Sequence, residues 1–520
     1  MFKFIRPEQI TEYIKDGDTV AINAFLALAN PDKLQDAMAE SFIKTGHPNN
    51  LELFTPSGCG CWDPDRIIDR CAGLGMIKRV VAGHYGSMPK ISELVKKGEI
   101  EAYNIPLGIL CQTLRSAGSG GPFILSKIGL DLFVDPRKGG PAMNEISKRE
   151  LVHYVNVLGQ EFLCYEIPKI DVALIKGTSV DPEGNIVFDN EFLSVNAINT
   201  AQAAKANGGK VIVQVDFATD KFSRPRNVVI PGVLVDAVLV ADGELDDIYK
   251  DDFIAMSGAV HVPPSHMDYW MGRLEASTSK KKGKADVSRW VIGDRGAQEL
   301  ERGQIINLGV GIPEQVGRCA AERGMLADLT MTVESGGLGG LPAPGLAFGA
   351  VIGADFICDT VQQFDFYHGG GLDICFMGGL EVDKDGNVNA HVLNGKYFGI
   401  GGFADITQST RKICFCLNFT AGGLSTEWTD GAIGEDGKKG PGKLTILQEG
   451  REPKFRESIE SISFSATNAV RNGQEVIYIT ERCVFRLTPE GLELVEVTPG
   501  IDKQTQVLDL LPFPVKDGTC

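Results

Sequence analysis

One carboxylate stands where a predicted strand meets a glycine-rich segment. Residues 329–333 read Leu-Thr-Met-Thr-Val, and Glu334 follows them directly. Glycine lets the backbone approach a ligand closely and adopt positive φ angles. A carboxylate presented beside such a segment is well placed to be a nucleophile, although a salt-bridged glutamate before a long turn would give the same pattern. Four of the six residues after Glu334 are glycines: Gly336, Gly337, Gly339 and Gly340.

Two further glycine-rich segments could interact with an anion. Asn307 lies near the end of a predicted strand, and the turn 309–312 leads to Pro313, where a helix is expected to begin. The N-terminus of a helix presents free N–H groups to an anion. Further along, Gly402 and Phe403 carry consecutive N–H groups that could form an oxyanion pocket. A simple tight turn and a glycine-rich hairpin remain alternatives for the two segments.

The order of these motifs resembles the class I CoA-transferase family. The chain reads NLGVGIP, then the VESG glutamate, then GGLDICFMGGLEVDKDGNVNAHVLNGK and finally GIGGFAD. The resemblance covers nearly the whole chain. It is strongest to the propionate and acetate CoA-transferase type, to which GLDLFVDPRKGG at residues 129–140 is most similar, and extends to the succinyl-CoA:3-ketoacid type.

The resemblance implies a role for each of the candidate residues. It implies that Glu334 forms a glutamyl-CoA thioester and that the backbone amides of Gly402 and Phe403 stabilise an oxyanion. It also implies acyl-CoA chemistry by a homodimer or homotetramer, with acyl-CoA and short carboxylic acids such as acetate, propionate or butyrate as partners. No cofactor is expected beyond the substrate coenzyme A, and no metal. The residues implied to line the CoA pocket are Asn307, Gly309, Val310, Gly311, Ile312, Gly378, Gly379 and Gly401.

One position departs from the family pattern. Many members have Pro-Gln-Gly where this chain has Pro106-Leu107-Gly108. Leucine has no hydrogen-bond donor in its side chain, so the amide that the glutamine contributes to the site is missing. Gln112 or a water molecule could replace that donor, or the choice of acyl group could differ.

Two other functions fit the same residues. An acyl-CoA hydrolase would use Glu334 in the same way, with water as the final acceptor. A non-catalytic phosphate- or CoA-binding protein of the sugar-phosphate isomerase-like fold would use only the glycine turns. A Ser/His hydrolase is disfavoured, because no GxSxG motif occurs in a strand–turn–helix setting and the seven histidines form no recognisable triad.

Two α/β halves that repeat each other are expected to position these residues. Asp171–Gly177 leads to Asp181-Pro-Glu-Gly-Asn185, and Asp373–Gly379 leads to Asp383-Lys-Asp-Gly-Asn387, with every pair offset by 202 positions. The alternation of strand and helix patterns indicates mainly parallel sheets flanked by helices. We expect strands at 304–308, 329–333 and 412–417 and helices at 33–43 and 314–323.

The Ser- and Lys-rich segment beginning AlaSerThrSerLysLysLys at residue 276 indicates a linker. The predicted domains are therefore an α-like domain at residues 1–275, a linker at 276–290 and a β-like domain with the glutamate at 291–520. A chain of 520 residues is long enough for two such domains.

Composition excludes several classes of protein. The net charge is −17, which disfavours binding to nucleic acid or to an anionic membrane surface. The N-terminal segment MFKFIRPEQITEYI lacks the apolar core of a signal peptide, and no run of about 18 apolar residues predicts a membrane span. The twelve cysteines show neither CxxC pairs nor a zinc-binding spacing, so we expect reduced, mostly buried thiols in a cytoplasmic protein.

Overall fold

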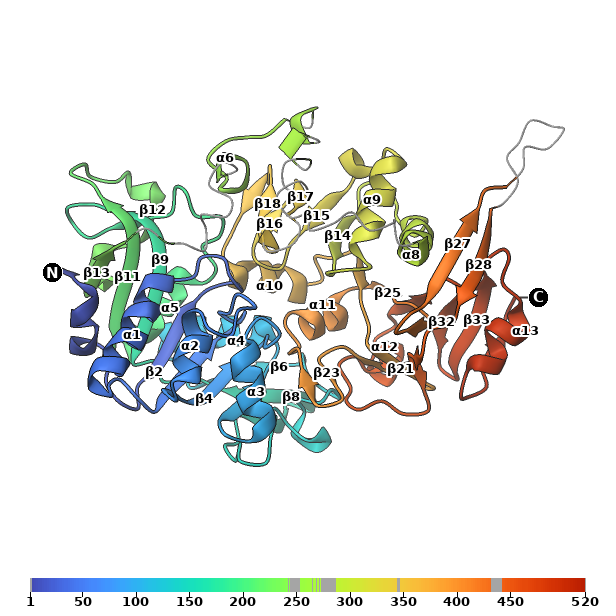
Figure 1. Cartoon of the computed structure of the whole chain (residues 1–520), viewed down its shortest axis with the longest axis horizontal. Helices are drawn as coiled ribbons and strands as arrows, with labels where there is room; N and C mark the ends of the chain where they lie inside the picture. Colours follow the sequence, from blue (N-terminus) through green and yellow to red (C-terminus); the bar gives the residue numbers. More distant parts are fainter. Residues whose placement is uncertain are drawn as a thin grey trace. The chain divides into compact units, whose positions relative to one another are not determined.

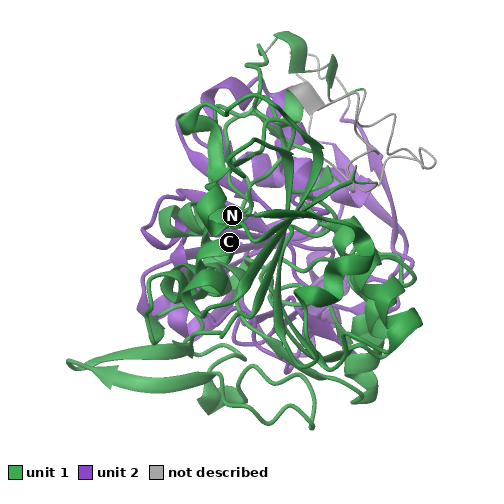
Figure 2. Ribbon diagram, turned by 90° about the vertical axis from the view of Figure 1, so that its left-hand side faces the viewer, with its two compact units in different colours: residues 1–278, 332–366, 395–405 green, residues 279–331, 367–394, 406–520 purple. Residues whose placement is uncertain are grey.

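The chain folds into two compact units, each built from separate stretches of sequence. Unit 1 comprises residues 1–278, 332–366 and 395–405, and unit 2 comprises residues 279–331, 367–394 and 406–520 (Figure 2). The computed structural model describes residues 2–241, 243, 253–263, 265–267, 269–270, 272, 287–343, 347–431 and 442–519.

A parallel β-sheet forms the centre of unit 1. Its main path has the order β1-β13-β11-β9-β2-β3-β4-β5, and every neighbouring pair along it is parallel. Parallel sheets are covered on both faces, and accordingly all nine residues of β9 are buried. The strands are β1 (Lys3–Ile5), β2 (Thr19–Asn23), β3 (Leu51–Thr55), β4 (Ile77–Ala82), β5 (Glu101–Asn104), β9 (Val172–Val180), β11 (Lys210–Ala218) and β13 (Ala237–Val240).

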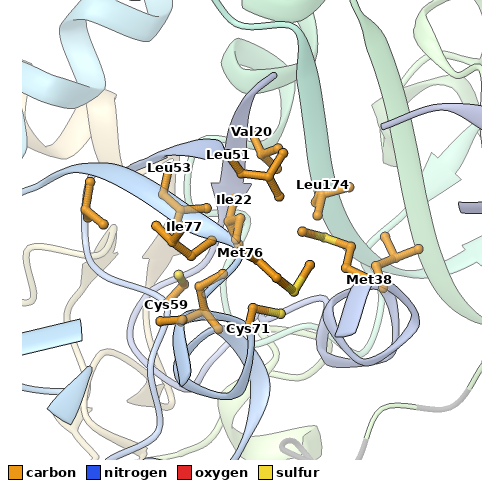
Figure 3. Packing of buried hydrophobic residues seen from close by; sticks show 14 of the residues in the cluster. Val20, Ile22, Met38, Leu51, Leu53, Cys59, Cys71, Met76, Ile77 and Leu174 are labelled. Atoms are coloured by element: carbon orange, nitrogen blue, oxygen red, sulfur yellow. The ribbon is translucent and has the colours of Figure 1, made fainter. Parts of the chain in front are cut away.

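Helices α1, α2 and α3 pack against this sheet and enclose a hydrophobic core with it. Met38 of α1 and Cys71 of α2 lie in one cluster with Val20 and Leu51 of the sheet (Figure 3). Burying each large aliphatic side chain contributes about 1.5–3 kcal/mol to stability. The helices of unit 1 are α1 (Asp32–Thr45), α2 (Ile67–Gly73), α3 (Pro89–Lys97), α4 (Leu107–Gly118), α5 (Ala197–Ala206) and α6 (Phe253–Met256).

Smaller strands extend unit 1. β10 (Ile186–Val187) pairs antiparallel with β9 and with β12 (Val228–Ile230). A separate antiparallel sheet has the order β6-β8-β7. Its strands are β6 (Phe123–Ser126), β8 (Gln160–Glu166) and β7 (Val152–Val157).

Unit 2 also contains a sheet that begins with parallel strands. The order is β14-β20-β25-β31-β32-β33-β34, with the first four strands mutually parallel and the pairs from β31 to β33 antiparallel. Its strands are β14 (Ile305–Leu308), β20 (Ile374–Met377), β25 (Lys412–Cys416), β31 (Glu475–Ile479), β32 (Cys483–Thr488), β33 (Gly491–Val497) and β34 (Lys516–Asp517).

Helices and short strands pack around the unit 2 sheet (Figure 1). α8 contacts α9 as well as β25 and β31. The unit's helices are α8 (Val287–Ala297), α9 (Glu314–Glu322), α12 (Ala466–Arg471) and α13 (Lys503–Gln506). Its short strands are β21 (Glu381–Asp383), β22 (Val388–Asn389), β23 (Val392–Leu393), β26 (Thr420–Ala421), β27 (Ser425–Thr429), β28 (Lys443–Gln448), β29 (Glu452–Pro453) and β30 (Phe455–Arg456).

The repeat seen in the sequence has the same hydrogen bonds in both units. In unit 1 the Asp181 carboxylate accepts hydrogen bonds from the backbone N–H and side-chain amide of Asn185, both at 3.0 Å. In unit 2 the Asp383 carboxylate accepts the equivalent bonds from Asn387, at 2.8 and 2.9 Å. Gly184 and Gly386 have φ angles of 84° and 89° in the two turns. Together with the mainly parallel sheets of the two units, these matching turns confirm the predicted α/β architecture of two similar halves.

The predicted domain borders differ from the two units. Residues 273–286, which include most of the predicted linker 276–290, lie outside the described residues. Val287–Trp290 form the first turn of α8, and Trp290 packs edge-on against Trp428 with ring centroids 5.4 Å apart. Residues 332–366 and 395–405 belong to unit 1 although they follow that linker in the sequence.

The described residues bear on two expectations from the sequence, that the cysteines are reduced thiols and that no segment spans a membrane. All eleven of the described cysteines are free thiols, and nine of them are buried. Within the described parts of the chain, no helix combines the length and the hydropathy needed to cross a bilayer.

Candidate active site

Glu334 lies at the tip of a tight turn between two short strands. β15 (Thr330–Thr332) ends just before it, and β16 (Gly337–Leu338) runs back antiparallel. The turn closes when the Gly336 N–H donates to the Val333 carbonyl at 3.0 Å. Gly336 has a φ of 130°, and a Cβ there would meet the Cys358 carbonyl oxygen at 2.0 Å, so only glycine fits. The strand predicted at 329–333 is therefore present as the shorter β15, and only Val333 lies between its end and Glu334.

Three hydrogen bonds fix the backbone on either side of this turn. The Ser335 hydroxyl donates to the Gly349 carbonyl. The Thr360 hydroxyl donates to the Ser335 carbonyl at 2.9 Å. The Cys358 N–H donates to the Gly336 carbonyl at 2.9 Å. Because none of these bonds involves the glutamate side chain, the turn holds its shape independently of that carboxylate.

A buried asparagine connects this turn to the main sheet of unit 1. The Asn196 carboxamide oxygen accepts the Val361 N–H at 3.1 Å, in the first turn of α10 (Thr360–His368). The Asn196 N–H donates to the side chain of Asn23, the last residue of β2, at 2.9 Å. Its side-chain amide donates to the Cys111 sulfur at 3.0 Å. Asn196 was not predicted from the sequence. The only sign of it there is that an asparagine interrupts the largely apolar run FLSVNAI at residues 192–198.

The backbone of Gly402 lies directly against the glutamate carboxylate. A Cβ built on Gly402 would stand 2.1 Å from Glu334 Oε2 and 2.9 Å from Phe364 Cζ. Its neighbour Gly401 donates its N–H to the Gly83 carbonyl at 2.8 Å, which holds the loop in place. The structure therefore brings together Glu334, Gly402 and the adjoining Gly401, which are far apart in the sequence.

The backbone N–H groups of Gly402 and Phe403, both predicted as oxyanion donors, differ in whether they already make a hydrogen bond. The Phe403 N–H, at the start of α11 (Phe403–Ser409), donates to the Ile400 carbonyl at 3.1 Å. Among the described residues, none accepts a hydrogen bond from the Gly402 N–H. Gly402 is thus the member of the pair with a donor available to a ligand, whereas the Phe403 donor is used within the loop.

Burial and a neighbouring acid shift the ionisation of Glu334. Burial of the carboxyl group, followed by the negative charge of Asp405, raises the pKa of Glu334 from 4.5 to about 7. Asp405 is fully buried and accepts the Gly108 N–H at 3.1 Å. Asp405 is the last residue of the GIGGFAD motif, but the sequence alone did not predict a role for it. A glutamate with a pKa near neutrality is a candidate nucleophile.

The position where many family members have glutamine is occupied by a buried leucine in this chain. Leu107 is 2% exposed, and its N–H donates to the Gly401 carbonyl at 2.9 Å. The Gln112 amide nitrogen donates to Asp365 Oδ1 at 3.0 Å. That nitrogen is therefore engaged by Asp365, which makes Gln112 a poorer substitute for the missing amide than the sequence suggested.

The remaining predicted residues gather at the carboxyl ends of the parallel strands of unit 2. The Gly309 N–H donates to the Phe376 carbonyl at 2.8 Å, which joins the turn after β14 to the end of β20. The Asn307 side chain donates to the Tyr367 hydroxyl at 3.2 Å and is 4% exposed. This edge is where open α/β sheets bind ligands. It carries Asn307, Gly309, Val310, Gly311, Ile312, Gly378 and Gly379.

Comparison with known proteins identifies the family of this chain. The sequence profile described as "Coenzyme A transferase" matches residues 6–241. The acetate CoA-transferase YdiF of Escherichia coli is 39% identical over 97% of this chain and 91% of its own length. The caffeate CoA-transferase of Acetobacterium woodii is 36% identical over 99% of this chain and 94% of its own.

Solved structures agree with the sequence comparison. The apoenzyme of the Escherichia coli acyl-CoA transferase YdiF superposes with a TM-score of 0.85 at 36% identity, over 100% of this chain and 94% of that one. A thioester complex of the same protein with CoA superposes with a TM-score of 0.84 at 36% identity, over the same shares of the two chains. A turn that presents a glutamate with a raised pKa, and relatives that match along the whole chain, lead to one conclusion: this chain belongs to the coenzyme A transferase family.

Proposed function

We propose that this chain moves CoA between a short-chain acyl-CoA and a free carboxylic acid through a thioester on Glu334. The observation that carries the proposal is the Glu334 carboxylate, held at the tip of a fixed turn against the backbone of Gly402. The thioester complex described for the Escherichia coli relative supports it.

The proposed reaction conserves the energy of the thioester in four steps. The Glu334 carboxylate attacks the acyl-CoA carbonyl, and the C–S bond breaks to give a mixed anhydride and CoA thiolate. The thiolate attacks the glutamyl carbonyl and expels the first acid, leaving glutamyl-CoA. The incoming carboxylate then attacks this thioester and releases the thiolate, which attacks the new acyl carbonyl and frees Glu334. No proton is consumed, and no redox step occurs.

The site offers two physical advantages for these steps. Burial raises the pKa of Glu334 to about 7, so the carboxylate is more basic than an exposed one while still ionised in a large fraction at neutral pH. Each tetrahedral intermediate carries negative charge on oxygen, which the free Gly402 N–H can stabilise. One such donor contributes about 3–4 kcal/mol to the transition state.

Acceptor exchange distinguishes a transferase from a hydrolase. With acetyl-CoA and propionate, we expect propionyl-CoA to form in the amount of acetyl-CoA consumed, measured by liquid chromatography. Without an added acid, we expect almost no free CoA. Release of CoA at the same rate with and without propionate would instead identify a hydrolase. Caffeate belongs in the acceptor panel, because a caffeate CoA-transferase is 36% identical to this chain.

Substitution of Asp405 by Asn should move the acid limb of the pH profile. The transferase needs ionised Glu334, so kcat/KM should fall as the pH drops below about 7. Removing the negative charge of Asp405 lowers the pKa of Glu334, so the limb should shift to lower pH. Asparagine keeps an oxygen that can accept the Gly108 N–H. A limb that stays at the wild-type pH in D405N, with the fold intact, would show that this charge has no effect on the nucleophile.

A further inference from the structure

Lys454 places a positive charge at the carboxyl edge of the unit 2 sheet. Its ammonium group donates a hydrogen bond to the Gly379 carbonyl at 2.7 Å, in the loop that follows β20. Its backbone N–H donates to the Phe419 carbonyl at 3.3 Å, in the loop that follows β25. β20 and β25 are neighbouring parallel strands. Lys454 therefore links two loops at the edge where open α/β sheets bind their ligands.

The ammonium group has unused donors and no dedicated counterion. A lysine ammonium carries three N–H donors, and within the described residues only the Gly379 carbonyl accepts one of them. Burial lowers the pKa of Lys454 to about 8, although the charges of Glu481 and Glu381 act in the opposite direction. An anionic ligand would supply the acceptors and the negative charge that this half-buried cation lacks.

Both nearby acids are committed to other partners. The Glu481 carboxylate accepts from the Arg482 guanidinium and from the Phe419 N–H, each at 2.9 Å. The Glu381 carboxylate accepts the Asn389 side-chain amide at 2.9 Å and lies 3.7 Å from Arg456. Neither acid forms an ion pair with Lys454 within the described parts of the chain.

The glycine backbone at this edge of the sheet is open to a ligand. A Cβ built on Gly378 or on Gly311 meets no atom within 4 Å. The turn that contains Gly311 lies beside β20, because Gly309 donates its N–H to the Phe376 carbonyl. Val310 in the same turn is 59% exposed, which adds an apolar surface. An ammonium, free glycine backbone and an exposed valine together suit a ligand with phosphate groups and an apolar arm.

We propose that Lys454 binds a phosphate group of CoA through its free N–H donors. This inference rests on the proposed function, since it takes CoA as the ligand. A lysine ammonium binds phosphate as a compact point charge, and hydrogen bonds between two ions are about twice as strong as neutral ones. CoA offers two sources of phosphate, the diphosphate and the 3′-phosphate on the ribose.

Calorimetric titration with CoA and its fragments tests the proposal. Substitution of Lys454 by Gln should weaken CoA binding by about 10- to 100-fold and leave pantetheine, which has no phosphate, unaffected. If 3′-dephospho-CoA still distinguishes wild type from K454Q, the diphosphate is the contact; if it does not, the 3′-phosphate is. The exposed Lys384, in the turn between β21 and β22, provides the matched control K384Q. Equal loss of affinity for pantetheine and CoA in K454Q would overturn the proposal.

The pH dependence of binding separates a phosphate contact from a structural role. Wild-type affinity for CoA should decline as the pH rises above about 8, where free Lys454 loses its proton, and K454Q should lack this decline. K454R, which keeps the charge, should retain part of the affinity if glutamine perturbs folding. These titrations measure binding alone, so they stay interpretable if Glu334 forms no thioester. A K454R protein with the K454Q affinity for CoA would contradict the phosphate contact.

Discussion

Substitution of Glu334 by Gln should slow CoA transfer from acetyl-CoA to propionate by at least about 10⁴-fold. Losing a nucleophile in covalent catalysis removes the main reaction path, and costs of about this size or larger are typical. A carboxamide is a poor nucleophile and cannot form the mixed anhydride. The initial rate of propionyl-CoA formation at saturating substrates measures the effect.

The glutamine variant should fold normally, which makes this loss interpretable. Among the described residues, none donates a hydrogen bond to the Glu334 carboxylate, whereas Ser335 and Gly336 make the bonds that shape the turn. E150Q, at an exposed glutamate of the same unit, is a matched control and should keep the wild-type rate. A folded E334Q protein that transfers CoA as fast as E150Q would exclude Glu334 as the nucleophile.

Substitution of Gly402 by Ala should reduce kcat by about 10²- to 10³-fold, the second largest effect. The added Cβ would stand 2.1 Å from Glu334 Oε2 and 2.9 Å from Phe364 Cζ. Phe364 is fully buried and cannot move aside easily, so the carboxylate or the loop must shift. Either shift separates the Gly402 N–H from the oxygen on which charge develops.

The split between kcat and KM identifies the cause of this loss. Apart from the neighbouring Gly401, the residues that we expect to contact CoA belong to other segments of the chain, so the KM for acyl-CoA should change less than kcat. G73A is the control, because its new methyl group would meet only the Lys90 side chain, at 3.6 Å. Wild-type kcat in a folded G402A protein would mean that the close approach of Gly402 to the carboxylate is not needed for catalysis.

Much of the fold was predictable because local patterns determined it. The expected strand at 304–308 is observed as β14 (Ile305–Leu308), and the expected helix at 314–323 is α9 (Glu314–Glu322). The expected helix at 33–43 corresponds to α1 (Asp32–Thr45). Strand and helix periodicity is a property of neighbouring residues, and so is the Asp…Gly-Asn turn that marks the repeat. Such features need no knowledge of distant contacts.

The residues that depend on distant contacts were harder to predict. The position of Gly402 against Glu334 joins segments 68 positions apart, and only the resemblance to the family suggested it. Asp405 and Asn196 act through buried hydrogen bonds to Gly108 and Val361, which leave no periodic signal in the sequence. Long-range packing also determines which stretches of sequence form each compact unit, so a search of the sequence for linkers does not predict the units.

Intact-protein mass spectrometry tests the thioester on Glu334 most directly. After brief mixing with acetyl-CoA and an acid quench, the protein should gain the mass of CoA minus one water, and peptide mapping should place this gain on Glu334. The E334Q protein should show no gain. A CoA adduct on a different residue, or rapid acyl exchange by wild-type protein that never carries CoA covalently, would contradict the account.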